Sequence, residues 1–343
     1  MKPNQILPIC WGLLLFSPLF LTSCSPAQSS AIIQTEQNSN DSDENRLPEF
    51  TPLKLNGRNL KVVATTNIIG DVVGNIGRDS IELTTLLSLN QDPHRYEATP
   101  RDLVALEEAD VIIVNGWDLE EQLASTIREN FSHKMVTISA YIEPLALSED
   151  SEHDSSHDLA HDLATDPHVW LSVRNVRQWS QNVEQVLHEL DPANSAVYAA
   201  NLEDYLAQLT VLEQEVDTLL AGVPNENRKL VTNHDALGYF AADYGFEIIG
   251  TVIPAASTSS EPSAIDLVQL VELMKSEEIC TLFAETTQNQ TLAQTVSAEL
   301  DGCESVQVLN LYTGSLGEGN ASSYVGMYLS NVNTIVNGLK SQK

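Results

Sequence analysis

Residues 191–222 read DPANSAVYAANLEDYLAQLTVLEQEVDTLLAG. Apolar side chains recur here at the three- and four-residue spacing of one helix face: Leu202, Tyr205, Leu206, Leu209, Leu212, Val216 and Leu219. Asp191 can cap this helix, Pro192 suits its first turn, and Gly222 ends it. About 30 residues give a helix of roughly 45 Å, which could run the length of a two-lobed molecule. The alternative is an ordinary core helix of one lobe.

Short apolar runs alternate with longer periodic segments on both sides of this stretch, which is typical of βα units and parallel sheets. Before it, the expected strands are Leu60–Ala64, Ile81–Leu87, Val111–Asn115 and Met135–Ile138, and the expected helices are Ile68–Ile76, Pro100–Glu108 and Leu119–Asn130. After it, the expected strands are Leu230–Thr232, Ile248–Val252, Ile279–Phe283 and Val306–Leu309, and the expected helices are Ala236–Tyr244, Ser263–Lys275, Thr291–Leu300 and Ser322–Leu339. We therefore expect an α/β fold with two βα lobes, residues 59–190 and 223–343, joined by a single long helix over residues 191–222.

The N-terminus has the features of an export signal. Lys2 precedes an apolar stretch that is too short, and too interrupted by proline, for a typical membrane-spanning helix. Residues 21–24, Leu-Thr-Ser-Cys, resemble the lipobox of bacterial lipoproteins, in which cleavage precedes a lipid-modified cysteine. We expect a signal peptide over residues 1–23 and a lipid anchor at Cys24; the alternative is a plain signal peptide with a chance cysteine. The polar residues that follow predict a flexible tether over residues 24–58.

The formal charge of −31 argues against nucleic acid or anionic lipid as a partner, because both would repel the chain. Of the four cysteines, Cys10 lies in the signal and Cys24 is the expected anchor. Cys280 and Cys303 remain as a pair in an oxidising compartment, each at or before the start of an expected strand, and we expect a disulfide between them. A zinc pair is the alternative, although the short C-x-x-C spacing is missing.

Residues 148–166 form an acidic, serine-rich segment in which His153, His157 and His161 are each followed by aspartate. Such a segment cannot form a core, so we expect a mobile loop that gathers metal ions loosely. The alternative is a solvated acidic surface loop without a role in metal binding.

Three other histidines follow probable strand ends: His94 in Asp92-Pro93-His94, His168 in Asp166-Pro167-His168, and His234 in Asn233-His234-Asp235. Ligands of open α/β sheets collect at the carboxyl ends of the strands. Neutral imidazole is a favoured zinc ligand, and three imidazoles make most of a tetrahedral site. Taken singly, each histidine is more often structural or exposed, but proline before two of them would orient a ligand. His133 and His188 lie on polar helix ends, where we expect surface residues.

Several motifs resemble those of the metal-binding solute-binding proteins of ABC uptake transporters. They are Asp92-Pro93-His94-Arg95-Tyr96-Glu97-Ala98-Thr99-Pro100, Asp166-Pro167-His168-Val169-Trp170-Leu171, His234-Asp235-Ala236-Leu237-Gly238-Tyr239-Phe240, Glu261-Pro262-Ser263, and Ala109-Asp110 to Asn115-Gly116 followed by Leu119-Glu120. The resemblance runs from about residue 60 to 340. It implies two βα lobes joined by one long helix, with a metal in the cleft between them and the three matching histidines as ligands.

The resemblance also bears on the metal. Members that bind manganese usually have glutamate at the third ligand position, whereas zinc members usually have histidine there and an acidic, histidine-rich loop; this chain has His234 and such a loop. Many members take a fourth ligand from aspartate in a C-terminal segment, but Gly314 occupies that place here. The fourth position is then water, a carboxylate such as Glu285, or a loop histidine. Ala98, where the family motif has proline, is a second departure.

These features predict an exported, membrane-anchored zinc-binding component of an ABC importer, without catalytic activity, which delivers Zn²⁺ to a permease in the cytoplasmic membrane. We expect a monomer in the periplasm or at the cell surface. The alternatives are a manganese- or iron-binding member of the same family, a metal buffer or adhesin without a permease, and a zinc-dependent hydrolase with Glu285 as its base. The hydrolase alternative lacks a motif such as H-E-x-x-H.

Overall fold

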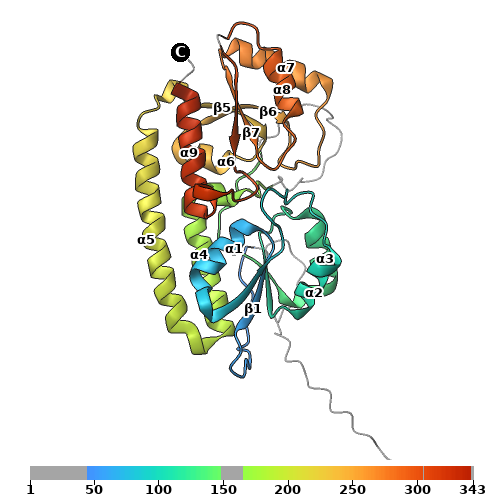
Figure 1. Ribbon diagram of the computed structural model, residues 1–343, viewed down its shortest axis with the longest axis vertical. Coiled ribbons are helices and arrows are strands. Elements are labelled where there is room, and N and C mark those ends of the chain that lie inside the picture. The colour runs from blue at the N-terminus through green and yellow to red at the C-terminus, as the bar shows by residue number, and fades with distance from the viewer. Residues whose placement is uncertain (1–44, 148–164, 304, 341–343) are drawn as a thin grey trace, which may run out of the picture.

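The computed structural model describes residues 45–147, 165–303 and 305–340. Within them, two lobes each contain a four-stranded parallel sheet, and long helices run along one side of both lobes (Figure 1). The strand orders are β2-β1-β3-β4 and β6-β5-β7-β8, so the lobes share one topology. The order reverses between β1 and β3 in one lobe and between β5 and β7 in the other, where ligands of open α/β sheets bind. The predicted fold of two parallel βα lobes is confirmed.

The N-terminal lobe contains the expected elements within a few residues of their predicted bounds. Its strands are β1 (Leu60–Ala64), β2 (Ile81–Thr85), β3 (Val111–Val114) and β4 (Met135–Thr137), and its helices are α1 (Asn67–Gly77), α2 (Pro100–Glu108) and α3 (Glu121–Phe131). All four residues of β3 are buried, as expected for a strand covered on both faces. Helix α2 begins in a capping box between Thr99 and Asp102, with Pro100 in its first turn.

The C-terminal lobe repeats this arrangement. Its strands are β5 (Lys229–His234), β6 (Glu247–Ile253), β7 (Thr281–Glu285) and β8 (Gln307–Leu311), and its helices are α6 (Gly238–Tyr244), α7 (Ala264–Ser276), α8 (Thr291–Ala298) and α9 (Tyr324–Lys340). A capping box between Ser263 and Asp266 starts α7, as one starts α2 in the other lobe. Helix α6 ends at Gly245, whose φ of 68° places it in the left-handed region that favours glycine.

One long helix connects the lobes, and a second long helix packs against it. Helix α5 (Ser195–Leu220) lies along both lobes and contacts α1, α4 and α9, which agrees with the predicted linking helix (Figure 1). It begins at Ser195 rather than Asp191, because residues 192–194 form a 3₁₀ turn; the Asp191 carboxylate accepts hydrogen bonds from the Asn194 amide and the Tyr198 hydroxyl. Helix α4 (Val173–Leu190) is not among the expected elements, although its buried residues recur at helical spacing and Ser172 caps it.

The core explains how the two lobes are held together. One continuous cluster of buried apolar residues includes β1 and β3, one face of the second sheet, and the inner faces of α1, α4, α5 and α9. Separate clusters cover the other face of each sheet, under α2 and α3 in one lobe and under α7 and α8 in the other. Because the helical layer is shared, packing there resists separation of the lobes on that side.

Two expectations about the segments outside the lobes are wrong in part. Within the expected tether, Leu47, Phe50, Leu53 and Leu55 pack against the core, and the Leu53 backbone N–H donates to the Leu190 carbonyl. Residues 45–58 are therefore a segment packed on the lobe and not a free linker. The acidic loop ends before Asp166, because Thr165 bridges Ala146 and Asp166 is buried.

The signal, Cys24 and the histidines of the acidic loop lie outside the described residues. In the part of the chain that the structure describes, no helix is long and apolar enough to cross a membrane.

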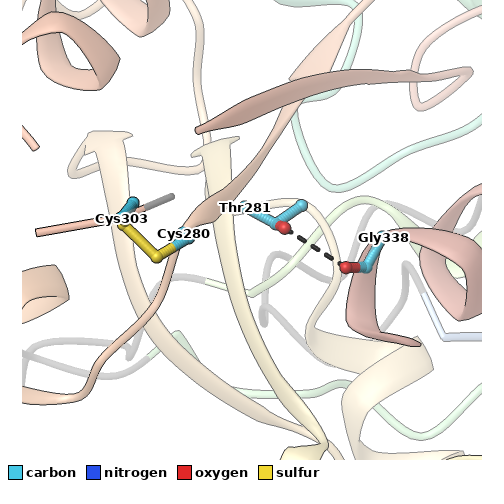
Figure 2. Close-up of a disulfide and its surroundings, with 4 residues drawn as sticks. All are labelled: Cys280, Thr281, Cys303 and Gly338. Carbon is cyan, nitrogen blue, oxygen red and sulfur yellow. Dashed lines mark hydrogen bonds between the residues drawn. A yellow bond between two sulfur atoms is a disulfide. The ribbon is translucent and has the colours of Figure 1, made fainter. Parts of the chain in front are cut away.

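A disulfide joins Cys280 and Cys303, as predicted (Figure 2). Cys280 directly precedes β7, Cys303 precedes β8, and α8 lies between them in sequence. Since β7 and β8 are neighbours, the two cysteines meet at the amino ends of their strands. On the other side of β7, the Thr281 hydroxyl donates to the Gly338 carbonyl of α9 at 3.3 Å (Figure 2).

Candidate metal centre

The three predicted histidines come together between the lobes. His94 lies in the loop after β2, His168 lies just before α4, and His234 is the last residue of β5. Their exposed fractions are 3%, 1% and 2%. Among the described residues, they form the one cluster of histidine, cysteine, aspartate or glutamate whose ligand atoms lie close enough together to hold an ion, within 4.8 Å of one another. His133 and His188 are exposed, as expected.

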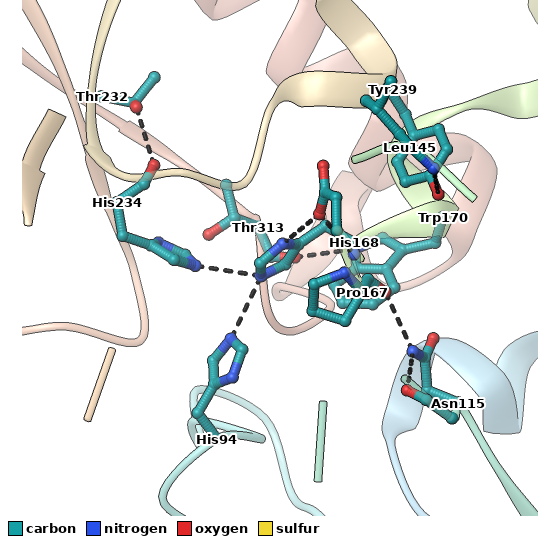
Figure 3. Close-up of polar contacts among 12 residues, drawn as sticks. His94, Asn115, Leu145, Pro167, His168, Trp170, Thr232, His234, Tyr239 and Thr313 are labelled. Carbon is teal, nitrogen blue, oxygen red and sulfur yellow. Dashed lines mark hydrogen bonds and ion pairs between the residues drawn. The ribbon is translucent and has the colours of Figure 1, made fainter. Parts of the chain in front are cut away.

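The imidazoles face one another through their Nε2 atoms (Figure 3). His168 Nε2 lies 3.2 Å from His94 Nε2 and 3.1 Å from His234 Nε2. Two nitrogen ligands of tetrahedral zinc, each about 2.0–2.1 Å from the ion, are separated by roughly 3.3 Å. The donor set and its spacing therefore fit a single transition-metal ion.

The aspartate of each Asp-Pro-His motif fixes the backbone of its histidine. Asp92 Oδ1 accepts from the His94 backbone N–H at 3.1 Å, and Asp166 Oδ1 accepts from that of His168 at 2.9 Å. This local turn, a common use of aspartate, orients the two histidine loops in the same way. From the sequence, proline alone is expected to orient these two histidines. The aspartate two residues before each of them is the signal that this expectation leaves out.

Carboxylates also contact two of the three rings at Nδ1, the nitrogen that does not face the other imidazoles. His168 Nδ1 lies 2.8 Å from Asp166 Oδ1, and His234 Nδ1 contacts Glu285 Oε1. Such a carboxylate fixes the tautomer that presents Nε2 to a metal and makes the imidazole a stronger ligand. Glu285, expected as a candidate fourth ligand or base, instead lies on the Nδ1 side of His234 and outside the cluster of converging ligand atoms. Its position follows from strand order, because β7 is the neighbour of β5.

The third ring is held differently. His94 Nδ1 is buried without a hydrogen-bond partner, and the nearest carboxylate oxygen in an ion pair with it, Glu121 Oε1, lies 3.7 Å away. His94 is therefore the histidine whose ring orientation depends most on its loop.

Burial sets the charge of the site. It lowers the pKa of His94 and His168 well below the ordinary value, and the neighbouring histidines add to this effect. Burial also opposes charge on His234, but Glu285, together with Asp92 and Asp166, outweighs it, and the His234 pKa is raised. The pKa of Asp166 is raised to about 7, mainly by burial. Two of the imidazoles are thus neutral near pH 7, as metal ligation requires.

Other side chains support the His168 loop. Asn115, which follows β3, donates from Nδ2 to the Pro167 carbonyl at 3.0 Å (Figure 3). Trp170 Nε1 donates to the Thr313 carbonyl of the other lobe at 2.8 Å (Figure 3). Both residues lie in motifs that resemble those of the family, but only the folded structure shows that they stabilise the loop that contains His168.

Gly314 lies beside the His94 loop. A Cβ atom at this position would be 3.1 Å from Pro93 Cδ and 3.6 Å from Thr287 Oγ1. Its φ is not among the positive values, so its backbone conformation is open to other residues.

Comparison with known proteins assigns the chain to a family. Residues 62–338 match the model of the zinc-uptake complex component A, periplasmic. The chain belongs to this family. It is thus the extracytoplasmic, metal-binding component of an ABC transporter, which is a solute-binding protein and not an enzyme.

Relatives of this chain are named for manganese. The chain is 32% identical to the manganese-binding lipoprotein MntA of Halalkalibacterium halodurans over 85% of its own length and 92% of the relative. It is 29% identical to the manganese ABC transporter substrate-binding lipoprotein PsaA of Streptococcus anginosus, over 82% and 90%.

The solved structures that superpose on the chain include both a zinc-binding and a manganese-bound protein. The periplasmic zinc-binding protein TroA from Treponema pallidum superposes with a TM-score of 0.73 at 30% identity, over 82% of this chain and 99% of that one. A manganese-bound periplasmic metal-binding protein from Candidatus Liberibacter asiaticus superposes with a TM-score of 0.69 at 28% identity, over 82% and 100%. Similarity therefore establishes metal binding and transport but leaves the choice of metal to the residues of this chain.

Proposed function

We propose that this protein captures Zn²⁺ outside the cytoplasmic membrane with His94, His168 and His234 and delivers it to an ABC permease. The observation that carries the proposal is the convergence of three buried imidazole nitrogens, with Nε2 separations of 3.1 and 3.2 Å. Zinc is the cargo of this site, and no chemical step follows its binding.

The donor set favours zinc over manganese. Zinc suits nitrogen ligands in a tetrahedron, whereas manganese prefers carboxylate, carbonyl and water oxygens in higher coordination. The ligand atoms that converge among the described residues are all imidazole nitrogens. Gly314 stands where many members of the family have an aspartate ligand, which leaves the fourth position to water or to a histidine of the acidic loop.

Manganese is the second candidate, because relatives of this chain are named for it. Asp166 and Glu285 lie close enough to the histidines for a rearranged site to include an oxygen ligand. Both carboxylates face Nδ1 atoms, however, so such a ligand would have to leave the histidine that it orients. We therefore place zinc first.

The remaining parts of the chain have consistent roles in this proposal. Cys24 carries the lipid that keeps the protein at the membrane beside its permease, and His153, His157 and His161 gather zinc loosely ahead of the tight site. Residues 59–190 and 223–343 act as the two lobes, and the protein works as a monomer.

Metal analysis of protein purified without added metal, followed by calorimetry of each histidine variant, tests the proposal. We expect one tightly bound zinc per chain, and loss of most tight binding in His94→Ala, His168→Ala and His234→Ala with the fold retained. His188→Ala removes an exposed histidine near the end of α4 and is the matched control. Tight zinc binding that survives any of the three substitutions removes that residue from the site, and a preference for manganese in competition overturns the choice of metal.

A further inference from the structure

Asp92 connects a metal-site histidine to the opposite lobe. Its Oδ1 accepts from the His94 backbone N–H at 3.1 Å within the N-terminal lobe. Its Oδ2 accepts from Thr258 Oγ1 at 2.6 Å and from Gln288 Nε2 at 2.5 Å. Thr258 follows β6 and Gln288 follows β7, so both donors come from the carboxyl ends of strands in the C-terminal lobe. One carboxylate thus joins the His94 loop to two loops across the cleft.

The second Asp-Pro-His motif uses its aspartate differently. Asp166 Oδ1 accepts from the His168 backbone and also contacts Nδ1 of the His168 ring. The ring of His168 is therefore oriented within its own motif. His94 has no such partner at Nδ1, and the second oxygen of Asp92 is directed to the other lobe instead. The two motifs share a turn but differ in what stabilises the histidine.

The loop that contains Thr258 contacts the surroundings of His94 at a second point. The Ser257 hydroxyl donates to Glu121 Oε1, the carboxylate oxygen nearest to His94 Nδ1. Thr258 is only 3% exposed, so separating its hydroxyl from Asp92 would leave a buried polar group without this partner. The contacts at this side of the cleft therefore favour the closed arrangement of the lobes.

We propose that Asp92 is a positioning residue that couples closure of the lobes to retention of the metal by His94. The proposal rests on the function proposed above. When Thr258 and Gln288 hold Oδ2, the Asp92 turn is fixed and His94 Nε2 stays directed at the ion. When the lobes part at this side, the turn loses two of its three hydrogen bonds and His94 is the first ligand to move. Opening of the cleft is thereby converted into weaker metal binding.

The test measures the rate at which zinc leaves the protein into excess chelator. Thr258→Val removes the hydroxyl at nearly constant shape, and Gln288→Leu removes the amide. Because hydrogen bonds to a charged group are strong, we expect the double variant to release zinc on the order of tenfold faster or more, with one zinc still bound per chain. Thr258→Ser keeps the hydroxyl and should restore the wild-type rate.

A double-mutant cycle separates coupling through Asp92 from a general loosening of the cleft. In an Asp92→Ala background, the Thr258→Val and Gln288→Leu changes should add no further acceleration, because their common partner is gone. Ser315→Ala is the matched control: its hydroxyl accepts from Asn67 Nδ2 and the Asn90 N–H, a contact between the lobes that does not involve Asp92. We expect it to change the release rate much less.

Three results would overturn the coupling while leaving the zinc site standing. They are an unchanged release rate in the Thr258→Val and Gln288→Leu protein, an equal acceleration in the Asp92→Ala background, and an equal acceleration by Ser315→Ala. Failure of the zinc site itself is visible separately, as wild-type protein that takes up no zinc before any release is measured.

Discussion

Asp166 Oδ1 lies 2.8 Å from Nδ1 of His168 and accepts from the backbone N–H of the same residue at 2.9 Å. A single oxygen therefore fixes both the backbone and the ring of a metal-site histidine. The pair is almost completely buried, and this raises the Asp166 pKa to about 7. A bound cation would favour the charged form of Asp166, and the charged form in turn strengthens His168 as a ligand.

We expect Asp166→Asn to weaken zinc binding by about 10- to 100-fold, the usual effect of changing a carboxylate behind a metal-binding histidine. Asparagine can still accept hydrogen bonds, so the loss reports the missing charge. Competition titration with a chromophoric chelator measures it. Asp191→Asn, at another buried aspartate between α4 and α5, should leave zinc affinity unchanged. Equal affinities in Asp166→Asn and wild type would show that the charge has no part in zinc binding.

Zinc affinity should fall as the pH is lowered, because of His234. Glu285 raises the pKa of His234, whereas burial lowers those of His94 and His168, so His234 is the histidine from which zinc must displace a proton. The zinc affinity therefore rises with pH until His234 is neutral in the metal-free protein, and it is constant at higher pH. Glu285→Gln removes a carboxylate that raises this pKa, so the zinc affinity of the variant should become constant at a lower pH than that of wild type.

Zinc titrations from about pH 5.5 to about pH 8 test this predicted pH dependence of the affinity. At high pH the Glu285→Gln protein should bind zinc more weakly than wild type. This difference in zinc affinity should narrow as the pH falls, because protonation of His234 weakens zinc binding more in wild type than in the variant. Glu120→Gln, at a buried carboxylate that interacts with Thr65 and Asn115 instead, should keep the wild-type profile. A constant ratio of affinities across the range would contradict the assignment of the proton to His234.

Removing the disulfide should lower stability without changing zinc affinity. In the chain-entropy model, a closed loop of this length contributes roughly 3 kcal/mol, so Cys280→Ser with Cys303→Ser should lower the free energy of unfolding by about that amount. The disulfide lies before β7 and β8, whereas Glu285 and the metal site lie at the carboxyl ends of strands. Denaturant unfolding and zinc titration of the same preparation give both quantities. Two free thiols in the unfolded, unreduced mature protein would contradict the bond itself.

Gly314→Asp should shift the metal preference towards manganese. A side chain at position 314 starts 3.1 Å from Pro93, the residue before His94, and glycine is not required there by a positive φ. A new carboxylate near the site supplies the oxygen ligand that manganese prefers. Competition titrations with both metals in both proteins separate this effect from strain, because strain weakens the two metals alike. An unchanged manganese-to-zinc ratio would show that position 314 does not face the ion.

The elements of the fold can be predicted because they depend on near neighbours in the sequence. Leu60–Ala64 and Pro100–Glu108 have their predicted bounds, since a buried apolar run defines the strand and a capping box with proline defines the helix start. Helix α4 is not predicted because asparagine and serine (Asn175, Ser180 and Asn182) interrupt its buried face, although its apolar residues keep the helical spacing. Residues 45–58 look like a tether in sequence because their few apolar residues are scattered.

The export signal, the two βα lobes, the disulfide partners and the three converging histidines can all be predicted from the amino-acid sequence. Each of these follows from local periodicity, from motif resemblance or from elimination among few cysteines. Which carboxylate contacts which imidazole ring is visible only in the folded protein. Glu285 meets His234 because β5 and β7 are adjacent in the sheet, and Asp92 meets Thr258 and Gln288 because the two lobes face each other. Strand order and lobe packing depend on burial summed over the whole chain, so no spacing within a motif encodes such contacts.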